Sequence, residues 1–111
     1  MQSQFSSGLE PIRERFVNLL ASRNEEILNQ LDVALEQPAQ ATKALLIVEA
    51  VLHKVAGTAG TLGFDDLGER ALSVEYKVMV ARGSSAVNFG DVYQAIIAYL
   101  EYSTTITSSV D

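Results

Sequence analysis

Apolar residues recur at intervals of three and four positions through most of this 111-residue chain. In an α-helix this spacing places side chains on one face, so each such segment predicts an amphipathic helix with one buried stripe. The chain has only seven Gly and two Pro, which is too little turn chemistry for the many short strands of a sandwich or barrel. The sequence therefore predicts an all-α fold.

The first helical segment covers residues 9–36, and Pro11 is acceptable there because proline is tolerated in a first turn. The polar residues 22–24 interrupt its apolar stripe for two turns. We expect the helix to continue through them and to end at Gln37 and Pro38, because a residue before proline is biased away from helical geometry.

Three further helices follow. The second is expected to begin at a cap on Thr42 and to run to about Thr61. The third is expected to begin after a cap at Asp66 and to end at Gly83, which would adopt a left-handed conformation. The fourth is expected to begin near Asn88.

Four amphipathic helices with short connections pack most economically as an antiparallel up-down-up-down four-helix bundle. With 48% apolar residues, the chain has enough hydrophobic surface for one core. We therefore expect a single domain over residues 1–111, with residues 1–8 and 104–111 frayed.

Charge and composition exclude several classes of function. Eight Lys and Arg against 14 Asp and Glu give a net charge of −6. This is the wrong sign for a protein that binds the phosphate backbone of a nucleic acid. The absence of Cys excludes disulfides, thiol nucleophiles and thiolate zinc sites. Charged residues break the apolar stretches well short of the roughly 20 residues that span a bilayer. We expect a cytoplasmic protein that binds neither membrane nor nucleic acid.

The only histidine of the chain, His53, lies in the second segment but away from its apolar stripe. At about 100° per residue, its side chain is expected to face solvent, together with Gly57 and Gly60. Each glycine inside a helix costs about 1 kcal/mol relative to alanine, so two on an exposed face suit close approach by another protein. The alternatives are a solvated surface histidine and glycines that serve helix packing.

The run from His53 to Phe64 reads His-Lys-Val-Ala-Gly-Thr-Ala-Gly-Thr-Leu-Gly-Phe and is followed by Asp65-Asp66-Leu67 and later Glu75. It resembles the histidine-containing phosphotransfer (Hpt) domain of bacterial multistep phosphorelays. The shared pattern is a histidine, a glycine four residues later, small residues in the next turn, and Leu-Gly-Phe at the end of the helix. The four-helix layout extends the resemblance over the whole chain.

The resemblance implies that His53 accepts a phosphoryl group and that Gly57 provides clearance for the partner. Many family members carry a lysine three residues after the histidine, where this chain has Ala56, so Lys54 and Lys43 become the candidates for steadying the phosphoryl group. The residues expected on the docking face are Leu46, Glu49, Ala50, Ala56, Gly57 and Gly60.

Glu49 lies one turn before His53 and is the only close carboxylate. It is expected to be an ordinary solvated helix acid, and the alternative is that it orients the imidazole through a hydrogen bond. The Glu49 and His53 pair falls short of a metal site, because zinc sites need three or four protein ligands. We expect this chain to bind no metal or cofactor. The resemblance places magnesium on the partner receiver domain.

The implied function is that of a phosphoryl carrier, without enzymatic activity of its own, that uses His53 to shuttle a phosphoryl group between aspartates of response-regulator receiver domains. A neutral imidazole is a good nucleophile near pH 7. The expected partners of a monomeric chain are receiver domains and a sensor or hybrid histidine kinase. Two alternatives stay open: the phosphoacceptor domain of a chemotaxis-type histidine kinase, and a non-phosphorylated helical scaffold that docks receivers.

Overall fold

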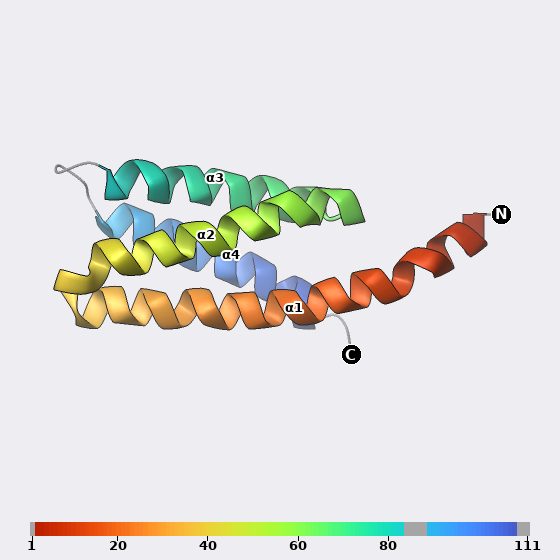
Figure 1. Cartoon of the computed structure of the whole chain (residues 1–111), viewed down its shortest axis with the longest axis horizontal. Helices are drawn as coiled ribbons and strands as arrows, with labels where there is room; N and C mark the ends of the chain where they lie inside the picture. The colour runs from red at the N-terminus through yellow and green to blue at the C-terminus, as the bar shows by residue number, and fades with distance from the viewer. Residues whose placement is uncertain (1, 84–88, 109–111) are drawn as a thin grey trace.

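The computed structural model describes residues 2–83 and 89–108, and over these residues the chain forms a bundle of four α-helices (Figure 1). The helices are α1 (Gln2–Glu36), α2 (Ala41–Ala59), α3 (Asp65–Arg82) and α4 (Phe89–Ser108). Two short 3-10 turns, η1 (Pro38–Gln40) and η2 (Gly60–Leu62), precede and follow α2. The predicted all-α, up-down-up-down bundle is confirmed.

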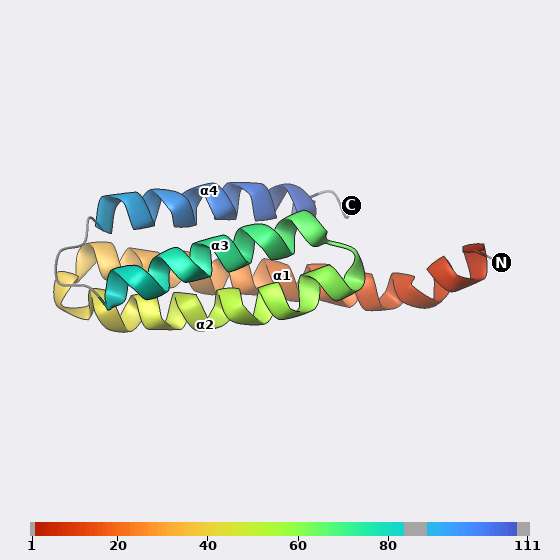
Figure 2. The same ribbon diagram turned by 90° about the horizontal axis from the view of Figure 1, so that it is seen from above.

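The helices form a ring in which α1 contacts α2, α2 contacts α3, α3 contacts α4, and α4 contacts α1 (Figure 2). Among residues 2–83 and 89–108, no close backbone contact joins α1 to α3 or α2 to α4. We call the surface between two neighbouring helices an edge of the bundle. The α2–α3 edge therefore lies on the opposite side of the bundle from the α1–α4 edge. The apolar stripes meet between the helices, and the most deeply buried core residues are Ile27, Leu45, Val48, Leu52, Ala59, Leu67, Ala71, Val78 and Ile96.

Helix α1 is continuous through the polar residues 22–24, as the periodicity predicted. It begins at Gln2 rather than near residue 9, so Pro11 lies inside the helix rather than in its first turn. The expected fraying of residues 1–8 stays a prediction. The N-terminal part of α1 extends past the bundle and curves away from it (Figure 1). A proline inside a helix removes one hydrogen bond and crowds the preceding turn, which favours such a bend.

The predicted helix caps at Thr42 and Asp66 are wrong. Thr42 lies inside α2, because η1 leads directly into the helix at Ala41. Asp66 is the second residue of α3, whose N-cap position is taken by Phe64. Neither helix has a side-chain hydrogen bond at its N-cap. In both places the preceding turn directs the chain into the helix without the help of a polar side chain.

The left-handed glycine is Gly63 (φ +89°), whereas Gly83 has φ −93° and does not adopt the predicted conformation. The N–H of Phe64 donates a hydrogen bond to the carbonyl of Ala59 (2.9 Å) at the end of α2. The chain must reverse tightly between η2 and α3, and glycine adopts a positive φ there without strain. The end of α3 makes no such demand on Gly83.

Helix α4 continues to Ser108 in the described part of the tail, and the fraying expected from residue 104 stays a prediction. Ser103 is buried, and its hydroxyl donates a hydrogen bond to Oδ1 of Asn24 in α1 (2.9 Å). This contact between segments 79 residues apart attaches the last turns to the bundle. The predicted start of α4 near Asn88 and the tail residues 109–111 lie outside the described residues.

The segment Pro38–Leu62 is long and apolar enough to cross a membrane by length and composition, with a mean hydropathy of 1.4. This finding corrects the expectation that no stretch of the chain reaches that length. In the bundle, α2 supplies a buried stripe that packs against α1 and α3. A long helix in a protein core meets the same criterion of length and apolar composition as a membrane-spanning helix.

Candidate functional site

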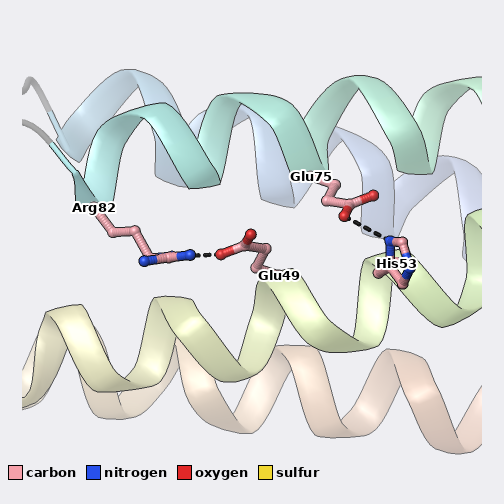
Figure 3. A network of polar contacts seen from close by, with 4 residues as sticks. All are labelled: Glu49, His53, Glu75 and Arg82. Atoms are coloured by element: carbon pink, nitrogen blue, oxygen red, sulfur yellow. Dashed lines mark hydrogen bonds and ion pairs between the residues drawn. The ribbon is translucent and has the colours of Figure 1, made fainter.

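His53 lies on α2 with 76% of its side chain exposed, as its position off the apolar stripe predicted. Its ring points towards α3, where Nδ1 lies 2.8 Å from Oε2 of Glu75 (Figure 3). An ionised carboxylate only accepts hydrogen bonds, so a neutral ring that bonds to it carries its proton on Nδ1. Nε2 then keeps a lone pair on a largely exposed ring. This arrangement is suited to nucleophilic attack.

Glu75 comes from α3, 22 residues after His53 in the sequence. Its side chain is only 16% exposed. Its second oxygen, Oε1, is buried and has no hydrogen-bond partner among the residues that the structure describes. Among the described residues, the imidazole of His53 is therefore the hydrogen-bond partner of this carboxylate.

Both interpretations of Glu49 are wrong: its side chain is only 14% exposed rather than solvated, and it does not bond to His53. Glu49 accepts a hydrogen bond from Nε of Arg82, near the end of α3 (Figure 3). This bond raises the pKa of the Arg82 guanidinium. Helical spacing correctly places Glu49 one turn from His53, but α3 brings a basic partner to Glu49 and an acidic partner to the imidazole. Two polar pairs thus bridge α2 and α3.

An open hollow of about 410 Å³ lies beside His53, between α2 and α3. Its described lining is made of small residues, two acids and one large apolar side chain, in addition to the imidazole: His53, Ala56, Gly57, Gly60, Asp65, Gly68, Glu69 and Leu72. Within residues 2–83 and 89–108, no three His, Cys, Asp or Glu side chains gather as a metal site. The hollow therefore offers access to the imidazole rather than a set of metal ligands.

Two of the glycines in this hollow are not required by packing within the chain. A Cβ at Gly57 would meet no atom within 4 Å, and a Cβ at Gly60 would meet only the carboxylate of Asp65, at 3.9 Å. Gly68 differs, because a Cβ there would lie 3.5 Å from the Cβ of Ala59, so its absence lets α3 lie close to α2. The free space at Gly57 is available to a partner molecule.

Exposed apolar side chains flank the hollow. Leu72 lines it and is 58% exposed, and Tyr76 and Met79 follow four and seven residues later on α3. Leu46 and Ala50 are exposed on α2, on the side of the helix that carries His53. We call the hollow and these five residues the His53 face. The sequence predicted the two α2 residues but not the three on α3. The available signal for these three was their helical spacing, which is offset from the core stripe of α3.

Lys54 and Lys43 do not line the hollow. Lys54 lines a recess between α1 and α2 with Leu19 and Arg23. Lys43 lies near the connection between the same two helices, beside Gln37. Helical spacing fixes the angle of a side chain about its own helix but not which neighbouring helix lies on that side. Among the described residues that line the hollow, none is a lysine or an arginine.

The Leu62-Gly63-Phe64 sequence attaches this end of α2 to α1. The carbonyl of Leu62 accepts a hydrogen bond from Nε of Arg13 (3.0 Å), and Gly63 makes the left-handed turn. The ring of Phe64 packs on that of Phe16, with 5.3 Å between the centroids. These contacts position the last turn of α2, which carries the glycines of the hollow.

Comparison with known proteins identifies one family. The family model described as Hpt domain matches residues 15–102, which cover most of the chain and include both His53 and Glu75. No curated protein and no solved structure matches the chain.

Proposed function

The chain belongs to the Hpt domain family, and on this basis we propose that it carries a phosphoryl group on His53 between aspartates of receiver domains. Hpt domains serve histidine phosphotransfer in two-component phosphorelays. The main observation in support is the pairing of His53 with Glu75, which in a neutral ring holds the proton on Nδ1 and leaves the lone pair on Nε2 of a largely exposed imidazole.

In the proposed transfer step, Nε2 attacks the phosphorus of a receiver's aspartyl phosphate, in line with the bond that breaks. The N–P bond forms, the P–O bond to the aspartate breaks, and the aspartate leaves as a carboxylate. The ring keeps its Nδ1 proton and becomes positively charged, and the Glu75 carboxylate, 2.8 Å away, stabilises that charge. In the reverse step the neutral imidazole is the leaving group, so no proton has to move.

The His53 face supports docking of a receiver next to the imidazole. Exposed apolar patches mark protein interaction sites, and the hollow at Gly57 lets a receiver loop approach closely. Lys54 and Lys43 lie outside the hollow, so we assign most of the neutralisation of phosphoryl charge to the receiver and its magnesium ion. The chain then acts as a carrier whose catalysis depends on its partners.

We also assign the carrier to the cytoplasm, where Hpt domains typically occur as soluble modules, and propose that it is monomeric. Its net charge of −6 opposes self-association. The expected kinase partner is a sensor or hybrid histidine kinase.

The function is tested by incubating the full chain with phosphorylated receiver domains. We expect a phosphate on the chain that is labile in acid and stable in alkali, with mass spectrometry under alkaline conditions placing it on His53. A label on another residue would overturn the assignment of His53. The absence of label from every receiver domain of the organism would leave a docking scaffold as the function of this face.

A further inference from the structure

A second recess, of about 590 Å³, lies between α1 and α4, on the edge of the bundle diagonally opposite the His53 face. Its described lining comes only from these two helices: Ala21, Asn24, Glu25, Leu28, Ile97, Leu100, Glu101, Thr104 and Thr107. None of these residues lines the hollow beside His53. The phosphotransfer reaction therefore leaves this recess without a role.

The recess exposes large apolar side chains from both helices. Leu28 of α1 is 49% exposed and Ile97 of α4 is 42% exposed, while Leu100, which also lines the recess, is half-buried. From Ile97 to Thr107 the recess follows α4 for about 15 Å, at 1.5 Å per residue. This length accommodates about three turns of another helix.

The charges along the recess have one sign. Glu25 and Glu101 line it from α1 and α4, and neither forms an ion pair with another described residue. The segment Phe89–Ser108 contains no Lys or Arg. Arg23 of α1 is bonded to Glu26 and lines the recess on the α1–α2 side instead. An apolar floor with acidic edges is complementary to an apolar stripe with basic edges.

We propose that the α1–α4 recess binds an amphipathic α-helix of a partner protein, one whose apolar stripe is flanked by lysines or arginines. The stripe would bury Leu28 and Ile97, and the basic side chains would pair with Glu25 and Glu101. A helix in a groove gains affinity from its apolar anchors, and charge complementarity fixes its orientation.

Charge also disfavours a second copy of the chain as the occupant. Two copies would each carry a net charge of −6 and would bring Glu25 and Glu101 of one against those of the other. Because the two edges are diagonally opposite, a helix bound between α1 and α4 leaves the His53 face accessible. One protein is thus able to hold the carrier while another exchanges phosphate with it.

The first experiment titrates a synthetic amphipathic peptide of about 18 residues, five helical turns, onto the isotopically labelled full chain and follows the backbone amides by NMR. The peptide carries a leucine stripe flanked by lysines. We expect saturable one-to-one binding, with shifts around Leu28 and Ile97 and none around His53. A matched peptide with glutamates replacing the lysines should bind at least about tenfold more weakly, a difference of about 1.4 kcal/mol. Equal binding of the two peptides, or shifts centred on His53, would overturn the proposal.

The second experiment compares Ile97→Asp with Leu35→Asp. Leu35 is 54% exposed on α1 but does not line the recess, so it is the matched control. Both positions are exposed, so both variants should unfold at about the same temperature as the unsubstituted chain. We expect Ile97→Asp to weaken binding of the lysine peptide at least about tenfold and Leu35→Asp to change its affinity by less than about twofold. Equal effects of the two substitutions would contradict a site in the recess.

The third experiment removes charge in two matched ways. The double variant Glu25→Gln/Glu101→Gln should abolish the preference for the lysine peptide, whereas Glu14→Gln/Glu36→Gln, with the same change in net charge, should preserve it. Equal effects would reduce the interaction to non-specific attraction and overturn the proposal.

Sedimentation of the chain alone should show a monomer. A dimer that Ile97→Asp dissociates would assign the recess to a second copy and would also overturn it.

Discussion

The two opposite edges of the bundle differ in what their charged side chains do. On the α2–α3 edge, Glu75 is bonded to His53 and Glu49 to Arg82, across the two helices. On the α1–α4 edge, the carboxylates that line the recess have no ion-pair partner among the described residues. Bonded groups hold each other in fixed positions, which a reacting imidazole needs. The two acids that line the hollow beside His53 form no ion pair among the described residues either, so what distinguishes the α2–α3 edge is the two polar pairs that bridge its helices.

The largest expected effect comes from His53→Gln, which tests whether the chemistry belongs to the α2–α3 edge alone. Phosphoryl acceptance should be lost entirely, because glutamine offers no nucleophilic ring nitrogen. Stability should fall by about 1 kcal/mol, because the substitution removes the hydrogen bond between the imidazole and the largely buried Glu75 carboxylate. Labelling with a phosphorylated receiver and a thermal melt measure the two quantities. Retained labelling would remove His53 from the mechanism.

The next largest effect is expected from Gly57→Gln, which tests whether the hollow is used for docking. A side chain at this open position should stabilise the helix by up to about 1 kcal/mol. It should slow transfer from a receiver at least about tenfold, because a displacement of the reacting groups by 1 Å can cost about a hundredfold. Labelling by phosphoramidate, a small donor that needs no docking surface, should stay unchanged.

Thr58→Gln is the matched control for Gly57→Gln, because Thr58 is exposed on the adjoining α1–α2 side of the same helix. It should leave transfer from both donors unchanged. If Gly57→Gln slows both donors equally, Gly57 shapes the imidazole itself. If it slows neither, the receiver docks elsewhere.

Replacing Glu75 by Ala tests whether the bonded carboxylate contributes to reactivity. Transfer should slow about tenfold, since hydrogen bonds to charged groups contribute about 1.5 kcal/mol or more. Nitrogen NMR should show that the ring loses its preference for a proton on Nδ1. Glu49→Ala is the control, because it breaks the pair with Arg82 without touching His53. Equal rates for the two variants would reduce Glu75 to a structural residue.

The smallest expected effect is that of Lys54→Ala. The side chain lines the α1–α2 recess rather than the hollow, and attraction from an exposed lysine is screened by salt. We expect the transfer rate to change by less than about twofold at low salt. A rapid-quench time course at low and high salt measures it. A tenfold loss at low salt that disappears at high salt would restore Lys54 as a phosphoryl contact.

Much of the fold and the centre of the site could be predicted because they depend on local spacing. The 3-4 apolar pattern predicted the helices, and the angle of His53 from its stripe predicted an exposed imidazole. Gly57 was identified as free space for the same reason. Left-handed geometry was assigned to Gly83 instead of Gly63, because two glycines near helix ends look alike until the connection between the helices is known.

The sequence by itself determined which face of each helix is apolar, where the exposed histidine lies and which end of α2 carries the motif. Only the tertiary structure decided that Glu75 rather than Glu49 bonds to His53, that Lys54 belongs to the α1–α2 side, and that Ser103 is held by Asn24. The physical reason is that periodicity fixes the angle of a side chain about its own helix. Its partner is decided by the rotation and offset of the neighbouring helix, which depend on the packing of the whole core.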